Sequence, residues 1–404
     1  MKIAYFLDIF YPEINGVITS TVNLAENLIK RGHKIYFITP KKENFKEPVV
    51  HGNIPVFYIP SVKAPLYPDM RFNLPWSRIF DGYIEKERFD IFHITSPWLM
   101  GWLAIHYGKK HNIPIVQTFH TMITEPHYVS YVVKSEKLIP LSQKILWWYI
   151  GRSLKNSDYI TAPSEYAKNE ILKKFPELTV EQISNGVDLE KFKHYKSFEE
   201  TKKEYPFLNR ESFIYVGRLG KEKSIDILIK AMGELVKKYP EAHLIIVGDG
   251  PEKEKLQTLT NELKLTRNVT FTGKIPHDKL IQSGLIHHSH CFVTASTSEN
   301  QSMTVIETLL CNTPPLVANV DGMRDIVNNE NALFSPFNYK ELAELMHKTL
   351  IDKTFYEALK KRTNKNAEQY DGMKIAERFE QIYTELLNNK KRQAEAPPED
   401  KKAI

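Results

Sequence analysis

The fold is decided by residues 291–318, which read CFVTASTSENQSMTVIETLLCNTPPLVA. The first five residues form an apolar run typical of a strand, and the next apolar residues recur at helical spacing: Met303, Ile306, Leu309 and Leu310. Glu299 therefore falls in the strand-to-helix turn, and Glu307 falls roughly two turns further on. In parallel α/β proteins this turn lies at the carboxyl edge of the sheet, where ligands bind. Both carboxylates are candidate ligand contacts, although an ordinary ion pair would explain them equally well.

The rest of the chain repeats this strand-and-helix alternation, which predicts parallel sheets covered by helices. A chain of 404 residues exceeds the usual size of one core, so two domains are expected. In the first half the expected strands are 3–7, 35–38, 56–59, 91–94, 115–119 and 159–162, with helices over 22–30 and 101–111. In the second half strands over 213–216, 243–247, 269–272, 291–295 and 316–318 alternate with helices over 225–238, 252–263 and 279–287.

A polar stretch without a strand pattern marks the domain boundary. We expect an N-terminal domain over residues 1–193, a linker over 194–211 and a C-terminal domain over 212–370. An amphipathic helix follows over 371–389. The charged, proline-containing residues 390–404 are expected to be disordered.

Composition indicates a soluble globular protein in the cytoplasm. No apolar stretch approaches the ~20 residues that span a bilayer, and Asp8 interrupts the first apolar run too early for a signal peptide. The two cysteines, Cys291 and Cys311, have apolar neighbours, which argues against a disulfide framework or a metal cluster. The net charge of +6 arises wholly within residues 1–196. A basic surface interleaved with aromatic residues fits either nucleic acid or an anionic membrane.

Cations follow the strand expected at 213–216. Gly217 and Arg218 come directly after it, and Lys223 follows five residues beyond Arg218. Arginine and lysine beside a glycine that admits close backbone approach are what a diphosphate requires. The alternative interpretation is a solvated basic turn.

Three further candidates follow strands, so they are also expected at the carboxyl edge of a sheet. Asp249 lies in the sharp turn Gly-Asp-Gly-Pro at 248–251, Gly16 precedes the first helix, and His120 ends the strand expected at 115–119. Gly16 could bring backbone N–H groups against a phosphate. A single histidine is more often structural than catalytic. The loop after the first strand contains no G-x-G-x-x-G, which argues against a dinucleotide site.

Taken together, these motifs resemble the retaining GT4 class of GT-B glycosyltransferases. The resemblance rests on Gly-Arg-x4-Lys at 217–223, VGDGP at 247–251, FTGKI at 271–275, Glu-x7-Glu at 299–307 followed by CNTPPLVA, and SNGVDLEKF at 184–192. It runs from residue 1 to about residue 390 and is strongest to the bacterial diacylglycerol α-glucosyltransferases. It implies two Rossmann-like doubly wound α/β domains facing across a cleft, with the final helix crossing back to the first domain.

The resemblance also assigns roles to particular residues. Arg218 and Lys223 would neutralise the diphosphate leaving group, and Glu299 would contact hydroxyls of the transferred sugar. Glu307 would accept hydrogen bonds from the ribose, and His120 would lie near the reacting carbon. The remaining donor contacts would come from Gly16, Gly217, Asp249, Lys274, Ile275, Asn300, Gln301, Ser302, Met303 and Thr304.

Two departures from the family pattern leave the donor open. Many members have Gly-Phe-Gly after the first glutamate, where this chain has Asn300, Gln301 and Ser302. The paired glycines common in the first loop are reduced here to Asn15-Gly16.

Two segments of the first domain mix cations with aromatic and apolar residues. Such mixtures suit the headgroup region of a membrane, although aromatic helical stripes are usually core. With the family resemblance, they predict a membrane and acceptor surface formed by Lys63, Arg71, Trp76, Arg78, Lys134, Lys137, Lys144, Trp147, Trp148 and Arg152.

The sequence thus predicts a retaining enzyme that moves glucose from UDP-glucose to diacylglycerol on the inner face of the cell membrane. No cofactor, metal or nucleic acid is expected, and stimulation by Mg²⁺ is left open. One alternative keeps the fold but uses another donor and acceptor, such as GDP-mannose with phosphatidylinositol, or builds a polysaccharide. Another is a basic surface-binding module with vestigial catalytic residues.

Overall fold

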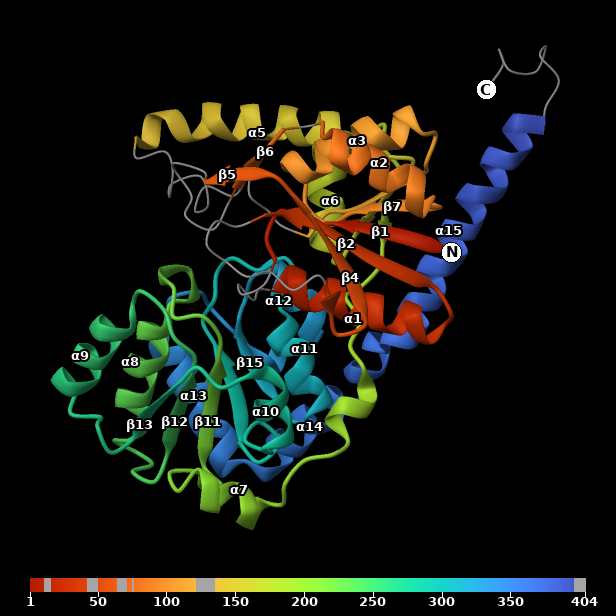
Figure 1. Cartoon of the computed structure of the whole chain (residues 1–404). Coiled ribbons are helices and arrows are strands. Elements are labelled where there is room, and N and C mark those ends of the chain that lie inside the picture. The colour runs from red at the N-terminus through yellow and green to blue at the C-terminus, as the bar shows by residue number, and fades with distance from the viewer. Residues whose placement is uncertain (11–15, 42–49, 64–70, 75, 121–134, 396–404) are drawn as a thin grey trace. The chain divides into compact units, whose positions relative to one another are not determined.

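The computed structural model describes residues 1–10, 16–41, 50–63, 71–74, 76–120 and 135–395. The chain forms two compact units (Figure 1). Unit 1 contains Met1–Gly186 and the segment from Gly372 onward, and unit 2 contains Val187–Asp371. Each unit has its own sheet and its own hydrophobic core.

The sheet of unit 1 has the strand order β10-β9-β8-β7-β1-β2-β4-β3. Neighbouring strands are parallel except β3 and β4, which are antiparallel. A separate antiparallel pair is formed by β5 and β6. The strands are β1 (Lys2–Phe6), β2 (Lys34–Pro40), β3 (Val50–His51), β4 (Ile54–Ile59), β5 (Ser61–Lys63), β6 (Arg71–Asn73), β7 (Ile91–Ile94), β8 (Ile115–Thr118), β9 (Tyr159–Ala162) and β10 (Glu181–Gln182).

Alternate side chains of β1 enter different cores, because successive residues of a strand point to opposite faces. Tyr5 packs in a cluster with side chains of α1 and α15, and Phe6 packs in a cluster with those of α2 and α3. Helices therefore cover both faces of the sheet. The helices are α1 (Gly16–Lys30), α2 (Arg78–Glu87), α3 (Leu99–Lys110), α5 (Ile139–Leu154), α6 (Glu165–Lys174) and α15 (Gly372–Glu395), with a 3₁₀ turn at Glu136–Leu138.

Helix α15 is attached to unit 1 by buried aromatic groups and by ion pairs. It runs beside α1 (Figure 1). The Arg378 guanidinium donates to both carboxylate oxygens of Glu181, at 2.7 and 2.8 Å. Tyr383 is fully buried against the sheet. The C-terminal segment is therefore an integral part of the first fold. Its helix continues to Glu395, whereas the sequence predicts its end at residue 389 and disorder from residue 390.

The sheet of unit 2 is parallel throughout, in the order β13-β12-β11-β14-β15-β16. The order reverses direction at β11 and β14, which is the position where doubly wound sheets bind ligands. The strands are β11 (Ser212–Val216), β12 (His243–Val247), β13 (Val269–Gly273), β14 (Cys291–Thr294), β15 (Pro315–Ala318) and β16 (Leu333–Phe334).

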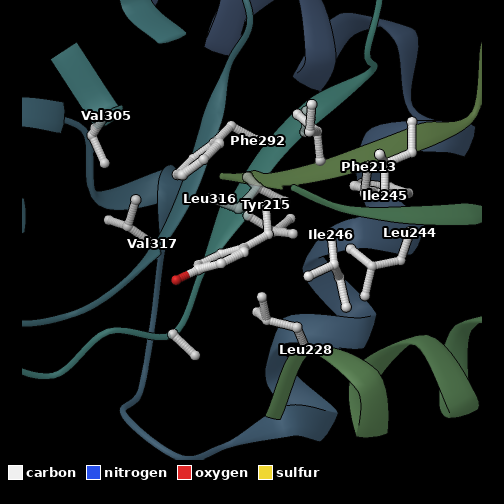
Figure 2. Close-up of a cluster of buried hydrophobic side chains, with 14 of the residues drawn as sticks. Phe213, Tyr215, Leu228, Leu244, Ile245, Ile246, Phe292, Val305, Leu316 and Val317 are labelled. Atoms are coloured by element: carbon white, nitrogen blue, oxygen red, sulfur yellow. The ribbon is translucent and has the colours of Figure 1, made fainter. Parts of the chain in front are cut away.

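The core of unit 2 lies between its sheet and its helices (Figure 2). Phe213, Tyr215 and Phe292 contribute large side chains from two adjacent central strands, and Leu228 contributes from α8. The helices are α7 (Phe198–Glu204), α8 (Ile225–Leu235), α9 (Lys253–Glu262), α10 (His277–Gln282), α11 (Met303–Leu310), α12 (Asp321–Val327), α13 (Tyr339–Ile351) and α14 (Lys353–Ala367). Short 3₁₀ turns are formed by Leu189–Phe192, Lys221–Lys223, Glu330–Ala332 and Glu368–Tyr370.

The structure corrects the expected boundary between the two domains. Unit 2 begins at Val187, and residues 194–211 are part of it. Their buried side chains Tyr205 and Leu208 join the core of unit 2. The sequence of this stretch resembles a linker because its polar residues belong to an exposed short helix. Its few apolar residues pack into the core of unit 2 and attach the stretch to that unit.

Candidate functional site

The loops after β11 and β12 meet at the carboxyl edge of the unit 2 sheet. The Leu219 N–H donates to the Asp249 carbonyl oxygen at 2.9 Å. Gly248 has φ of +143°, and a Cβ placed on it would lie 1.9 Å from the Gly217 carbonyl oxygen. Glycine is required here because any side chain would separate the two loops. The Asp249 carboxylate accepts from the Gly250 N–H at 2.8 Å and from Lys253, so in this structure it shapes its own turn.

Two of the residues singled out from the sequence are in direct contact at this edge. The Lys223 ammonium group, in the turn after β11, donates to Oε1 of Glu299, in the loop after β14. Ser296 donates its hydroxyl to the same carboxylate oxygen at 2.9 Å. The two charged side chains are 23% and 15% exposed, so both remain accessible to a ligand. A cation and a carboxylate thus lie side by side at this edge.

The loop that carries Glu299 packs closely against the first turn of α12. A Cβ on Gly322 would lie 1.9 Å from the Glu299 carbonyl oxygen, so only glycine allows this approach. Residues 300–302 then lead into α11, which begins at Met303. Ser302 precedes the helix but makes no side-chain capping bond among the described residues. The first amides of α11, which include that of Thr304, therefore face the same edge as Glu299.

Glu307 is the most deeply buried carboxylate of this edge. It lies on α11 with a side chain only 6% exposed, and its Oε1 lies 2.8 Å from Nε2 of His277, the first residue of α10. This negative charge raises the pKa of His277 to about 9, so the imidazole is protonated at neutral pH. His277 was not among the residues predicted from the sequence. Thirty positions separate it from Glu307, and no local spacing links the two.

The other predicted donor-site residues of unit 2 lie at the same edge. Arg218 follows β11 and is exposed. Lys274 and Ile275 follow β13, where Lys274 is exposed and Ile275 packs against the core. The structure therefore gathers the strand-end residues of unit 2 as their shared position after parallel strands predicts.

In unit 1, His120 lines a small cavity at the carboxyl ends of β7 and β8. The cavity has a volume of about 20 Å³, which is room for about one water molecule. Ser184, Asn185 and Gly186 also line it, and they belong to the family motif at 184–192. Burial lowers the pKa of His120 to about 4, so its imidazole is neutral at physiological pH. Gly16 is the first residue of α1, whose Ser20 and Thr21 line the same cavity.

The outer side of α5, together with the last residue of the 3₁₀ turn before it, carries an apolar stripe that is exposed to solvent. Leu138, Leu141, Ile145 and Trp148 follow one another at helical spacing and are 51%, 56%, 56% and 60% exposed. We call these four residues the α5 stripe. Lys137, Lys144 and Arg152 are exposed along the same segment, and the Arg152 guanidinium lies 5.2 Å from the Trp148 ring centre.

Trp147 was wrongly placed in the predicted membrane surface. Its side chain is buried, and its ring lies 6.1 Å from those of Phe119 and Phe175. Adjacent positions on a helix differ by about 100° in direction, so the neighbouring Trp148 faces outward. Trp147 is therefore a core residue of unit 1.

The remaining residues of the predicted membrane surface fall in other parts of unit 1. Trp76 is 59% exposed, and Arg78 is the exposed first residue of α2. Lys63 is exposed on β5, whereas Arg71 on β6 donates to the Ser61 hydroxyl at 2.8 Å and so braces the β5–β6 pair. Lys134 lies outside the described residues.

The described parts of the chain contain neither a metal-binding cluster nor a membrane-spanning helix. No group of three or more His, Cys, Asp or Glu side chains there is placed to hold a metal ion. No helix within those same ranges combines the length and apolar character that crossing a membrane requires.

The chain resembles known proteins along nearly its whole length. The family model of glycosyl transferases group 1 matches residues 197–369, and that of glycosyltransferase family 4 matches residues 14–191. An α-monoglucosyldiacylglycerol synthase of Acholeplasma laidlawii is 31% identical over 97% of this chain and 99% of its own length. A synthase of the same name from Streptococcus pneumoniae is 26% identical over 84% of this chain and 76% of its own.

Solved structures agree on the fold. A sucrose-phosphate synthase from Thermosynechococcus elongatus superposes with a TM-score of 0.76, at 21% identity, covering 96% of this chain and 99% of that one. The two parallel α/β units, the paired glutamates on one sheet edge and the full-length similarity lead to one conclusion. The chain belongs to the GT4 family of glycosyltransferases and has the GT-B fold.

Proposed function

We propose that this enzyme transfers glucose from UDP-glucose to 1,2-diacylglycerol and retains the anomeric configuration, giving α-monoglucosyldiacylglycerol. The observation that carries the proposal is the full-length similarity to the A. laidlawii synthase of that product. The exposed α5 stripe and its cations add independent support, because a soluble acceptor would not require them.

The edge of unit 2 supplies the groups that a nucleotide sugar needs. Arg218 and Lys223 would bind the diphosphate and stabilise the charge that develops as it leaves. Lys223 already contacts Glu299, so a sugar hydroxyl on Glu299 would lie next to the phosphate on Lys223. The ribose would bind Glu307, and Lys274 and Ile275 would border the base.

The remaining donor contacts come from backbone groups and from unit 1. The amides at residues 300–304 precede or begin α11, where backbone N–H groups favour an anion or a hydroxyl oxygen. His120, neutral at physiological pH, would donate or accept a hydrogen bond near the reacting carbon. Gly16 would lie near the phosphates. In this scheme the acceptor oxygen bonds to the anomeric carbon as the bond to phosphate breaks, and the leaving phosphate takes the acceptor proton.

A diacylglycerol acceptor dissolves in the membrane, so the enzyme must act at its surface. Full burial of an exposed leucine or isoleucine contributes roughly 1.5–3 kcal/mol, and each cation near an anionic surface contributes about 1 kcal/mol. The α5 stripe with Lys137, Lys144 and Arg152 fits such a surface. We place the enzyme on the inner, cytoplasmic face of the cell membrane as a peripheral protein.

The decisive test is transfer of radiolabel from a panel of UDP- and GDP-sugars to diacylglycerol in mixed micelles, with and without anionic lipid. The proposal expects a labelled glucolipid from UDP-glucose alone, and nuclear magnetic resonance of the product should show the α anomer. Parallel reactions with EDTA and with added Mg²⁺ measure any stimulation by a metal.

Other outcomes would replace the proposal with a stated alternative. Transfer of mannose from GDP-mannose to phosphatidylinositol would change both donor and acceptor. Hydrolysis of a donor without any lipid product would move the acceptor to a soluble glycan or small molecule. Vesicle binding without hydrolysis or transfer from any donor would indicate that the protein is a surface-binding module without activity.

A further inference from the structure

A nearly buried carboxylate needs a partner, since an unpaired charge away from water is costly. The Glu307 side chain is 6% exposed, and the partner it has is the His277 imidazole, 2.8 Å from Oε1. The two residues come from different helices, α11 and α10, which follow different strands. The contact therefore depends on the tertiary fold, and sequence neighbours do not provide it.

The contact fixes one oxygen of the carboxylate and leaves the other for a ligand. Oε1 accepts from His277, and among the described residues no donor is recorded on Oε2. The Glu307 side chain keeps 6% of its surface exposed, so part of it is open to a ligand. A carboxylate held in this way cannot rotate freely, and its second oxygen points in one direction.

The His277 side chain is itself partly open, at 41% exposed, and it carries a second acidic neighbour. Its Nδ1 lies 3.7 Å from Oδ1 of Asp278, beyond hydrogen-bond distance. Glu307 and Asp278 are the acidic groups that raise its pKa, so the bond to Oε1 is charge-assisted at neutral pH.

We propose that His277 is a positioning residue for donor recognition, which holds Glu307 so that its free oxygen meets the ribose hydroxyls. The inference rests on the proposed function, in which Glu307 binds the ribose. It extends that function by naming a residue that acts through Glu307 and by naming the part of the donor it controls. His277 then sets how strongly the enzyme distinguishes a ribose from a sugar without those hydroxyls.

The experiment compares the affinities of UDP and 2′,3′-dideoxy-UDP, measured by calorimetry on the full-length protein. The wild-type enzyme should prefer UDP by roughly ten- to a hundredfold, since hydrogen bonds to a charged group are the strong ones. His277→Ala should lose most of this preference by weakening UDP roughly tenfold, with the dideoxy nucleotide little changed. His277→Gln keeps an N–H donor near the position of Nε2 and should restore much of the preference.

Two reference variants separate the possible failures. Glu307→Ala should remove the preference altogether. His194→Ala makes the same chemical change as His277→Ala at an exposed position of unit 2, and it should leave the preference as in the wild type. Loss of the preference in Glu307→Ala with full preference in His277→Ala would overturn the inference and leave the donor role of Glu307 intact. Full preference in both variants, or no binding of UDP by the wild type, would overturn the donor role of Glu307 and the inference with it.

Steady-state kinetics provide a second readout that a purely structural role would not give. If His277 acts through binding of the ribose, His277→Ala should raise KM for the nucleotide sugar about tenfold and leave kcat within roughly threefold. The reason is that the ribose is bound equally strongly in the ground state and in the transition state, so loss of this contact weakens binding without slowing the chemical step. A fall in kcat with unchanged KM would contradict the inference.

Discussion

The Tyr383 hydroxyl lies 2.7 Å from Nδ1 of His93, although the two residues are 290 positions apart. The same hydroxyl lies 2.9 Å from that of Tyr5, and Nε2 of His93 lies 2.7 Å from the Thr118 hydroxyl. Burial lowers the pKa of His93 to about 3, so the ring is neutral and uses one nitrogen as donor and the other as acceptor. This buried chain of polar groups joins α15 to three strands of unit 1.

Tyr383→Phe should destabilise unit 1, because the buried side chains of His93 and Tyr5 would each lose a hydrogen-bond partner. We expect a loss of about 1–3 kcal/mol, the usual cost of leaving a buried polar group unsatisfied. Thermal unfolding followed by near-UV circular dichroism measures it. Tyr195→Phe makes the same change at a residue that is 47% exposed and should have little effect. Equal midpoints for the two variants would mean that the buried chain contributes nothing to stability.

The adjacent tryptophans Trp147 and Trp148 should respond to alanine in opposite ways. Trp147→Ala leaves a cavity in the core and should cost about 3–5 kcal/mol of stability. Trp148→Ala removes an exposed ring of the α5 stripe, so it should leave the unfolding midpoint nearly unchanged and weaken binding to anionic vesicles. Vesicle sedimentation and thermal unfolding on both variants check this. Unchanged vesicle binding by Trp148→Ala would remove α5 from the membrane surface.

The cations beside the α5 stripe should make vesicle binding depend on salt. Changing Lys137 and Lys144 together to glutamine should weaken binding to anionic vesicles by about 2 kcal/mol, roughly thirtyfold, and flatten its salt dependence. The matched control changes Lys34 and Lys174, which are exposed on other elements of unit 1. Equal losses in the two double variants would indicate a general charge effect with no contribution specific to α5.

Lys223→Ala tests the proposed role of the cation that contacts Glu299. Loss of a group that stabilises the leaving diphosphate should lower kcat/KM by roughly 10²–10³-fold. Lys221→Ala is the matched control, because Lys221 is an exposed lysine of the same short 3₁₀ turn. We expect that variant to stay within about threefold of the wild type. Similar activity of the two variants would refute the assignment of Lys223 to the diphosphate.

The ion pair of His277 with Glu307 should make stability depend on pH in alkaline solution. Glu307 raises the pKa of His277 from 6.5 to about 9. The stabilising contribution is therefore fully present below pH 6.5 and is lost as the pH rises to about 9. The difference in unfolding midpoint between the wild type and His277→Gln should shrink over this range. A difference that stays constant from pH 6 to roughly pH 10 would mean that the pair is not ionic.

Much of the fold could be predicted from sequence because the central strands are short, apolar and clearly bounded. The expected ranges 91–94, 159–162 and 243–247 match β7, β9 and β12 at both ends. Helix α1 begins at Gly16, whereas the prediction began it at Val22, because Thr19, Ser20 and Thr21 give little apolar periodicity. Helix α10 ends at Gln282, before Gly284 with φ of +78°, whereas the prediction continued it to His287.

The candidate site was predictable for those residues that directly follow a strand in the sequence. Arg218, Lys223 and Glu299 each follow a strand, and parallel strands bring their ends to one edge. The partner of Glu307 was not predictable, because His277 is brought to it by the packing of two helices. The opposite orientations of Trp147 and Trp148 also depend on packing, since α5 carries apolar residues on two of its sides.

The second unit is a single uninterrupted segment whose two ends meet. Val187 donates its N–H to the Tyr370 carbonyl oxygen at 3.0 Å, and Val187 and Asp371 form a bridge. Unit 1 is instead assembled from two pieces of chain. A ribosome thus completes the second unit before the first, and the first cannot bury Tyr5 and His93 until α15 has been synthesised. Premature termination after residue 371 would consequently allow unit 2 to fold but leave unit 1 incomplete.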